Sequence, residues 1–461
     1  MTRVVVLGGG IAGLTAAFRR RWEGSDSETV VLESGSRVGG SIRTVVDGGL
    51  VLEAGPNTLR TNAATERLLA DLGLEGEVVE ADPRAPRYVY RKGRPRAIVP
   101  GPRGLFTKAI SLGGKLRVLR EPFVPGREWS REDESVHDFF LRRFGPELAR
   151  YAAGPIVSGV YADDPATLSV RSAFPSLWDA EERGGSVLRG FLKRDTAPGP
   201  RPPRVRSRTL TFRRGLRALP ETLSERLDEM GAAVQLECEV SAIEGPLPPG
   251  RASRRWRVVT ADGRVFEADR VLSTLDALRL ASLLGPRLPR SGSRLTALSY
   301  SRLAVVLQAW RAPSEKAAPK GFGVLVPRGE GLKALGILYP ASLFPGRAEP
   351  GVALTTSFLG GALEPGLPGL SDAELLALGE AEVRRVHPGL SERLFARVER
   401  WPAAIPRLPV GHHETLALLA SDLAELDRGE AKESFLVTGA WREGVSLADR
   451  IAAGEAMGQK L

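Results

Sequence analysis

The sequence is poor in cysteine, in aromatic residues and in long hydrophobic runs. Cys238 has no second cysteine to pair with, so an internal disulfide is excluded and a reducing compartment is expected. No stretch approaches the roughly 18 consecutive apolar residues of a transmembrane helix. The chain passes from Met1 and Thr2 directly into the pattern of a buried strand, without a basic and then apolar leader. We therefore expect neither secretion nor a transit peptide.

Histidine is also scarce, with four residues in the whole chain: His137, His387, His412 and His413. None falls in the pattern of a catalytic triad or of a metal site. His412 and His413 are adjacent, so in a strand their side chains would face opposite ways, and we interpret both as ordinary surface residues. The sequence therefore predicts no bound metal and no histidine-based catalysis.

The net charge of +10 comes from 65 basic and 55 acidic side chains. Such a balance favours an anionic partner, either nucleic acid, acidic lipid or a carboxylate substrate. Aromatic residues make up only 6% of the chain and no zinc-finger or RNA-recognition pattern is present, so nucleic acid is the weakest candidate. A solvated, arginine-rich surface explains the charge equally well. The length of 461 residues and the 42% hydrophobic content predict two or three domains with a large core.

The start of the chain has the pattern of a strand, a glycine turn, a helix and a second strand. Residues 3–7 predict a buried parallel strand, residues 11–22 a helix, and residues 29–33 the next strand. In the turn, Gly8 permits a tight bend and Gly10 lets a pyrophosphate approach the backbone, while a third glycine, Gly13, lets the helix pack closely on the sheet. The helix N-terminus offers free N–H groups to the phosphates. This pattern predicts a dinucleotide site.

A carboxylate and a second glycine pair follow this unit. Glu33 lies 20 residues after Gly13, where a carboxylate can accept hydrogen bonds from ribose hydroxyls. Directly afterwards comes the segment 37–44, Arg-Val-Gly-Gly-Ser-Ile-Arg-Thr. The combination resembles the two-dinucleotide-binding-domain flavoproteins, which include amine oxidases, phytoene desaturases and protoporphyrinogen oxidases. The resemblance implies FAD rather than NAD, with Arg37 and Gly39–Gly40 near the pyrophosphate and flavin.

Three later segments extend the resemblance. Gly55-Pro56 would lie against the isoalloxazine, Val240 would hold the adenine through its backbone, and the backbone of residues 438–447 would face the flavin pyrimidine or the ribityl chain. The whole set of expected cofactor-binding residues is Gly8, Gly10, Ile11, Ala12, Gly13, Glu33, Ser34, Arg37, Gly39, Gly40, Ser41, Gly55, Pro56, Asn57, Val240, Thr274, Trp401, Gly439, Ala440, Gly444, Val445 and Ser446.

Four further segments, residues 82–90, 158–165, 321–327 and 342–347, resemble the protoporphyrinogen oxidases, and the resemblance covers nearly the whole chain in order. It implies an oxygen-dependent, FAD-containing enzyme of haem and chlorophyll synthesis. Arg87 would pair with a propionate of the tetrapyrrole, which suits a guanidinium fork. Leu325, Leu338 and Phe358 would sandwich the macrocycle, and Gly159 would lie where any Cβ would intrude on substrate and flavin.

The reaction implied is hydride transfer from a methylene bridge to flavin N5, with O2 as acceptor and H2O2 as product, so that the cofactor carries the chemistry and no catalytic side chain is named. Two residues depart from the family pattern. Ala440 stands where asparagine is usual, and Arg450 where a cysteine is often found. The first change removes a polar side chain near the cofactor, so FAD affinity or the flavin environment could differ, whereas backbone contacts would survive.

Three alternatives stay open. The same machinery could oxidise coproporphyrinogen III to coproporphyrin III, which a more cationic pocket rim would favour. An amine oxidase or carotenoid desaturase is more distant, because no lysine and aromatic cage is visible and Arg87 would repel a cationic amine. The last alternative is a non-enzymatic FAD-binding protein.

The predicted fold class is α/β plus α+β. A discontinuous, Rossmann-like FAD-binding domain comprises residues 1–80, 206–285 and 400–461, a substrate-binding domain with a mixed sheet comprises 81–95 and 286–399, and a helical membrane-binding domain comprises 96–205. Residues 105–110 and 116–120 mix apolar and basic side chains as interfacial segments do, although ordinary amphipathic helices fit equally well. The resemblance implies a cytoplasmic protein, peripheral on the inner face of the cell membrane, and a homodimer.

Outside the first βαβ unit, periodicity and turn residues locate the remaining elements. Strands are predicted over residues 234–240, 255–260, 269–274, 304–309, 323–326, 335–339, 352–358 and 434–438. Helices are predicted over 135–144, 145–157, 215–228, 275–284, 373–386 and after residue 439, and a surface linker over 196–208.

Overall fold

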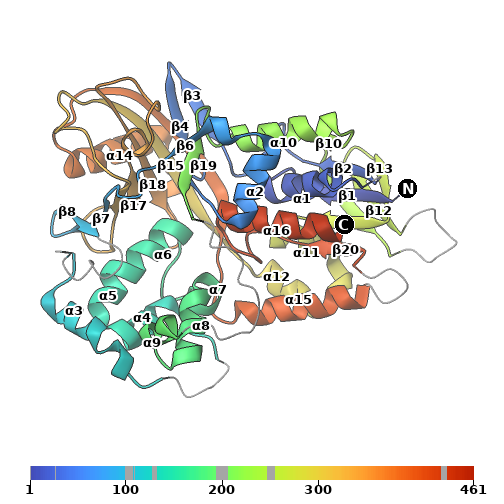
Figure 1. Ribbon diagram of the computed structural model, residues 1–461, viewed down its shortest axis with the longest axis horizontal. Helices are drawn as coiled ribbons and strands as arrows, with labels where there is room; N and C mark the ends of the chain where they lie inside the picture. Colours follow the sequence, from blue (N-terminus) through green and yellow to red (C-terminus); the bar gives the residue numbers. More distant parts are fainter. Residues whose placement is uncertain are drawn as a thin grey trace.

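The computed structural model of the chain describes residues 2–25, 27–98, 107, 109–126, 132–193, 206–246, 255–426 and 433–461. Residues 105, 106 and 108 of the predicted interfacial segment, and residues 196–205 of the predicted linker, lie outside this part. The chain forms a mixed α/β fold in which two sheets and a group of helices occupy different parts of the molecule (Figure 1).

A five-stranded parallel sheet lies at the right of Figure 1, in the order β10-β2-β1-β14-β20. Its strands come from the start, the middle and the end of the chain: β1 (Arg3–Leu7), β2 (Glu28–Leu32), β10 (Ala233–Gln235), β14 (Arg270–Ser273) and β20 (Phe435–Val437). Val4 to Leu7 are fully buried, as expected for a strand covered on both faces.

Different elements cover the two faces of this sheet. Val4 and Val6 point into a core shared with α1 (Ile11–Trp22), α2 (Ala63–Leu72), α10 (Ala218–Glu229) and α16 (Leu447–Lys460). Val5 and Leu7 point to the other face, where α11 (Ala277–Leu284), part of α15 (His412–Leu426) and the antiparallel sheet of β11 (Val240–Glu244), β12 (Trp256–Thr260) and β13 (Val265–Ala268) pack. Alternating side chains thus bury both faces.

The second large sheet has seven strands in the order β19-β15-β18-β17-β16-β7-β8. It is mixed, because β16 and β7 pair in parallel and the other neighbours are antiparallel. Its strands are β7 (Arg87–Arg91), β8 (Arg94–Ile98), β15 (Tyr300–Arg311), β16 (Gly323–Leu325), β17 (Ala334–Leu338), β18 (Val352–Gly360) and β19 (Arg393–Pro406). Helix α14 (Asp372–Val386) begins in a capping box of Ser371 and Glu374 and covers one face.

Short antiparallel pairings connect these parts. They are β3 (Thr44–Asp47) with β4 (Leu50–Glu53), and β5 (Leu59–Arg60) and β6 (Val78–Glu80) on either side of β9 (Thr209–Phe212). Two further helices are short: α12 (Gly292–Thr296) precedes β15, and α13 (Pro340–Leu343) follows β17.

The remaining helices, at the lower left of Figure 1, share a separate apolar core. They are α3 (Leu112–Leu119), α4 (Val136–Phe144), α5 (Pro146–Leu148), α6 (Gly154–Tyr161), α7 (Val170–Ala173), α8 (Pro175–Gly184) and α9 (Val187–Leu192). A π-helical turn, Ala149–Ala153, interrupts the helix predicted over 145–157. Among the described residues, no helix is both long and apolar enough to cross a membrane.

Most predicted elements are confirmed with ends shifted by a few residues, but the strand predicted over 234–240 is wrong. The chain leaves β10 at Gln235, adopts a left-handed conformation at Glu237 (φ 51°), and enters β11 of a different sheet at Val240. Strands β7, β8 and β19 and helix α15 were not predicted. In β19 the arginines and Pro402 obscure the alternation of apolar and polar residues.

Candidate functional site

The turn between β1 and α1 has the shape that a pyrophosphate requires. A Cβ on Gly13 would lie 2.1 Å from the Gly8 carbonyl oxygen, so only glycine permits this helix–turn contact. A Cβ on Gly10, in contrast, would meet no atom of the described residues within 4 Å. No side chain caps the N-terminus of α1, so the N–H groups of its first turn, at Ile11 and Ala12, are available to an anion.

Two side chains hold this turn in place. Glu33 lies just past β2, and its carboxylate accepts hydrogen bonds from the Gly9 N–H (2.8 Å) and the Gly35 N–H (2.7 Å), with Ser34 exposed between them. Thr274 follows β14 and donates through Oγ1 to the Leu7 carbonyl (2.8 Å). The carboxylate therefore fixes the glycine turn from the end of β2, and its role toward the ribose stays a prediction.

The second glycine pair packs against the first. The Gly39 N–H donates to the Gly9 carbonyl (2.8 Å), and a Cβ on Gly40 would lie 3.4 Å from the Gly10 Cα. Arg37 donates to the carbonyls of Gly40 and Ile42, both at 2.8 Å. Burial, and then the neighbouring Arg43, lower the pKa of Arg37. The structure thus places the Arg37 guanidinium on its own loop, where it shapes the glycine pair.

A cavity of about 550 Å³ opens between the glycine pair and the second sheet. Its lining combines predicted cofactor and substrate residues: Ser41, Gly55, Pro56, Asn57, Gly159, Leu325, Leu338, Phe358, Trp401, Ala440, Val445 and Ser446. The Trp401 indole N–H donates to the Ala54 carbonyl (2.8 Å) and so joins β19 to the segment before Gly55. A Cβ on Gly159 would lie 2.4 Å from Leu325 Cδ2, so a larger residue would displace the wall.

Arg87 and Val240 belong neither to the lining of this cavity nor to the glycine turns. Arg87 is exposed on β7, paired in register with Gly323, and its guanidinium carbon lies 5.1 Å from the centre of the Phe322 ring. Val240 starts β11, and its carbonyl accepts a hydrogen bond from Arg279 (2.7 Å).

Other lining residues were not predicted from the sequence. They are Thr58, Arg60, Ser158, Val160, Ala162, Leu303, Val305, Leu335, Gly336, Ala404, Ile405, Pro406, Leu447 and Arg450, together with Ala54. Seven of them come from β15, β17 and β19, and only the sheet pairing brings these strands together. Arg450 was noticed only as a departure from a family pattern, which gave no indication that it lines the cavity.

Comparison with known proteins decides the family. The model of the flavin-containing amine oxidoreductases matches residues 11–452. The chain belongs to this family. Protoporphyrinogen oxidase 1 of Arabidopsis thaliana chloroplasts is 34% identical over 99% of this chain and 86% of its own length, and protoporphyrinogen oxidase of Homo sapiens is 33% identical over 98% and 96%.

Solved structures show the same fold at lower identity. A crystal structure from Exiguobacterium matches with a TM-score of 0.80 at 22% identity, over 100% of this chain and 98% of that one. Cyclohexylamine oxidase from Brevibacterium oxydans matches with a TM-score of 0.67 at 14% identity, over 100% and 99%. The protein is a flavin-dependent oxidoreductase, and its cofactor is FAD.

The residues present fit this cofactor. The open space at Gly10 suits a pyrophosphate, and the cavity continues from Ser41 toward the turn that precedes α16. Glu443 shapes that turn, since its carboxylate accepts from Thr438 Oγ1 (2.8 Å) and from the Gly439 N–H (2.9 Å). Burial raises the pKa of Glu443. Gly444 has a φ of 129°, a conformation that favours glycine.

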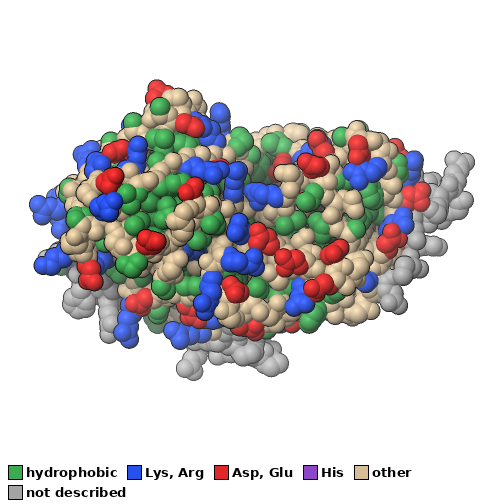
Figure 2. Space-filling view, turned by 90° about the horizontal axis from the view of Figure 1, so that it is seen from above, with side chains coloured by type: hydrophobic (Ala, Val, Ile, Leu, Met, Phe, Trp, Pro, Cys, Tyr) green, Lys and Arg blue, Asp and Glu red, His purple; other side chains and the backbone are tan. Residues whose placement is uncertain are grey.

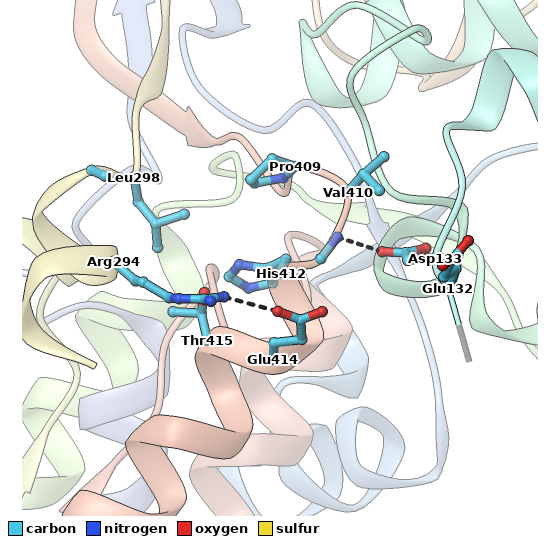
Figure 3. A pocket seen from close by; sticks show the side chains of 11 residues that line it. Glu132, Asp133, Arg294, Leu298, Pro409, Val410, His412, Glu414 and Thr415 are labelled. Carbon is cyan, nitrogen blue, oxygen red and sulfur yellow. Dashed lines mark hydrogen bonds and ion pairs between the residues drawn. The ribbon is translucent and has the colours of Figure 1, made fainter. Parts of the chain in front are cut away.

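A second cavity, of about 540 Å³, lies on the other side of this turn (Figure 3). It contains His412, whose Nε2–H donates to the Trp441 carbonyl (2.7 Å) because a carbonyl can only accept. Figure 3 shows the imidazole between Leu298, Pro409 and Thr415, near the Arg294–Glu414 ion pair. The interpretation of His412 as a surface residue in a strand is wrong: it is 2% exposed and begins α15, and burial lowers its pKa.

His412 therefore supports the turn between β20 and α16 through its hydrogen bond to the Trp441 carbonyl. His413 is only partly exposed and lies 3.7 Å from Asp133. Within the described residues, no group of three or more histidine, cysteine or acidic side chains could hold a metal ion.

Proposed function

We propose that this flavoprotein oxidises protoporphyrinogen IX to protoporphyrin IX, with O2 as acceptor and H2O2 as product. The observation that carries the proposal is the single cavity that joins Gly55–Asn57 and Ala440–Ser446 to the apolar wall of Leu325, Leu338 and Phe358. The named activity of the Arabidopsis and human relatives, which match nearly the whole chain, supports the same reaction.

The lining suits a wide apolar ring with acidic edges. Glycines at positions 159 and 336 leave the wall beside Leu325 without side chains. The charged side chains among the described lining residues are Arg60 and Arg450, and no carboxylate lines the cavity. A cationic amine would find no counter-charge there, whereas a propionate group would find a guanidinium partner in Arg60. This disfavours an amine oxidase.

The chain's own residues would bind and orient the substrate. FAD supplies a hydride acceptor when it is bound, and the apolar wall holds a methylene bridge towards the flavin side of the cavity while excluding water. The backbone N–H groups near Val445 and Ser446, just before α16, would face the pyrimidine end of the flavin. No acidic or histidine side chain lines the described cavity, so we expect the pyrrole N–H protons to leave to solvent or to the flavin.

Porphyrin fluorescence of the purified holoenzyme in air tests the proposal. Protoporphyrinogen IX and coproporphyrinogen III are offered separately, and autoxidation is subtracted. We expect fast formation of protoporphyrin. The second candidate, coproporphyrinogen oxidation, is favoured by Arg60 at the cavity, because its guanidinium suits an additional carboxylate. The ratio of the two kcat/KM values decides between the two substrates. No product from either substrate with FAD bound would overturn the proposal in favour of an amine, carotenoid or non-enzymatic role.

Arg87→Ala is expected to raise KM for the porphyrinogen about 10-fold and to lower kcat less. The predicted partner of Arg87 is a propionate remote from the reacting carbon, so the pair stabilises ground state and transition state alike. A hydrogen bond to a charged group contributes about 1.5–3 kcal/mol. Steady-state kinetics measure the change in KM. The control is Arg84→Ala, which removes a nearby exposed arginine. An unchanged KM would remove Arg87 from the site.

We also propose that residues 96–205 form a membrane-binding domain beside the FAD-binding and substrate-binding domains predicted above. An exposed apolar patch supports this: Leu112, Leu116, Leu119, Phe123, Phe191 and Leu192. Arg189 lies over the Phe123 ring (5.8 Å), so α9 and the turn after α3 are adjacent. Lys115, Arg117, Arg120 and Lys193 supply the positive charge of an interfacial surface. The cytoplasmic location at the inner membrane face and the homodimer stay predictions.

The double variant Phe123→Ser/Leu192→Ser is expected to lower binding to vesicles of phosphatidylglycerol and phosphatidylcholine about 100-fold. Each side chain is about four-fifths exposed, at 79% and 83%, and burial of such a side chain contributes about 1.5–3 kcal/mol. Vesicle sedimentation measures the change. The matched control is Val265→Ser, which replaces an exposed apolar side chain of β13. Equal losses in both variants would place the membrane contact elsewhere.

A further inference from the structure

Arg450 is a buried cation that lacks a counter-charge. It lies in the first turns of α16 and lines the main cavity. Its Nη1 donates to Ser41 Oγ (3.1 Å), while its Nε is buried and has no hydrogen-bond partner among the residues that the structure describes. Within the described part of the chain, no carboxylate lies within ion-pair distance of its guanidinium. Burial lowers the pKa of Arg450 to about 10, and the nearby charge of Asp449 offsets this only in part. An anion beside the guanidinium would satisfy both the charge and the unpaired N–H.

The packing of α16 on α1 locates this guanidinium. A Cβ on Gly454 would lie 2.5 Å from the Ala12 carbonyl oxygen, and one on Gly458 would lie 2.6 Å from the Ala16 carbonyl oxygen. From the first contact to the second, the position advances by four residues in α16 and by four residues in α1. The two helices therefore lie side by side and run in the same direction. Arg450 is one step of four residues, about 6 Å, before Gly454. It is therefore level with the glycine turn that precedes α1.

A second, independent contact leads to the same place. Ser41, which accepts the Arg450 hydrogen bond, follows Gly40, and a Cβ on Gly40 would lie 3.4 Å from the Gly10 Cα. Gly10 is the position at which an added Cβ meets no protein atom. Through Ser41 and Gly40, the unpaired cation is thus connected to the open space at Gly10 and to the N-terminus of α1.

We propose that Arg450 pairs with the pyrophosphate of FAD and is a cofactor-positioning residue of this chain. A planar guanidinium can donate two parallel hydrogen bonds to phosphate oxygens, while the uncapped N–H groups of α1 donate from the other side. Ser41, by accepting from Nη1, holds the side chain toward the phosphates. The inference rests on the FAD cofactor of the proposed function and does not depend on which porphyrinogen is oxidised.

The test is FAD retention by purified holoenzyme. Arg450→Met is expected to weaken FAD binding roughly 10- to 100-fold, the loss of one charged hydrogen-bonded contact, as measured by the fluorescence of FAD released on dilution. Arg450→Lys keeps a point charge and is expected to recover part of the affinity. Arg226→Met, an exposed arginine of α10, removes the same charge elsewhere and should leave retention unchanged.

Two further readouts distinguish the pyrophosphate from other partners. The reduction potential and visible absorption of the bound flavin should stay unchanged in Arg450→Met, because the contact is remote from the isoalloxazine. A shifted potential with unchanged FAD retention would place the guanidinium at the flavin ring and overturn the proposal. Unchanged retention with a raised KM for porphyrinogen would assign Arg450 to a substrate carboxylate and would also overturn it. If Arg450→Met does not fold, equal FAD retention by Arg450→Lys and Arg450→Gln would contradict a role for the charge.

Discussion

Gly10→Ala is expected to lower FAD affinity at least about 100-fold, or about 2.7 kcal/mol, while the protein stays folded. The backbone at Gly10 (φ −74°, ψ 174°) suits alanine, and the added Cβ meets no protein atom within 4 Å. The methyl group therefore obstructs only a ligand. The folded state loses at most about 1 kcal/mol, because alanine is a poorer N-cap than glycine. Fluorescence titration of FAD and the melting temperature measure the two effects.

Alanine substitutions at two other glycines serve as controls for this result. Gly76→Ala also meets no protein atom but lies far along the chain in a 3-10 turn, so FAD affinity should not change. Gly13→Ala places a Cβ 2.1 Å from the Gly8 carbonyl oxygen and should lower both stability and FAD binding. If Gly10→Ala retained the wild-type affinity, the pyrophosphate would have to lie elsewhere in the cavity.

Arg347→Met is expected to lower the free energy of unfolding by about 3–5 kcal/mol, because it leaves the Glu53 carboxylate buried without its cation. Arg347 and Glu53 are 3% and 2% exposed, and Arg347 Nη1 lies 3.2 Å from Glu53 Oε1. Glu53 also accepts from the Leu216 N–H (2.8 Å) and from Thr44 Oγ1 (2.7 Å), and Arg347 reaches Thr211. This cluster links β3, β4 and β9 to the segment that follows α13. Urea titration measures the loss.

The loss should also depend on pH. Burial raises the pKa of Glu53, and Arg347 opposes that rise. Without the arginine, the folded variant holds the carboxyl proton more tightly than the unfolded chain does. The stability deficit of Arg347→Met should therefore be smallest below the ordinary pKa of a glutamic acid and should grow as pH rises.

A double variant separates charge from packing. Glu53→Gln/Arg347→Met removes both charges and should be more stable at neutral pH than Arg347→Met alone. If it were not, loss of side-chain packing rather than the unpaired charge would explain the effect. Arg311→Met, which breaks an exposed pair with Glu392, should change stability by no more than about 1 kcal/mol.

The cofactor end of the site was predictable from the sequence because it is local. Gly8, Gly10, Gly13 and Glu33 belong to one βαβ unit, whose strands and helix lie within the first 33 residues. The spacing of glycines around a strand end carries the physical requirement for a tight turn and a close phosphate, so both fold and chemistry followed from the residues.

The substrate wall could not be predicted to the same extent. Leu303 and Ile405 line the cavity beside Leu325, but they belong to β15 and β19, whose pairing depends on contacts between residues about 100 positions apart. His412 was misjudged because nothing in its neighbours indicates that a helix begins there under the cofactor turn. Arg450 was known only as a departure, since its burial depends on how α16 packs against α1. The charge of the whole chain was equally uninformative, because basic and acidic side chains are interspersed over the face shown in Figure 2.

The order of strands in the parallel sheet has a consequence for biosynthesis. β1 pairs with β14, and β14 in turn pairs with β20, the strand that leads through the turn at Gly439 into α16. While the chain is being made, the edge of β14 stays unpaired and the glycine turn lacks its neighbouring helix until β20 and α16 have left the ribosome. Such long-range pairing slows folding and exposes a strand edge to other chains. FAD should therefore be acquired only after β20 and α16 have been synthesised, and the supply of cofactor at that stage should set the yield of folded protein.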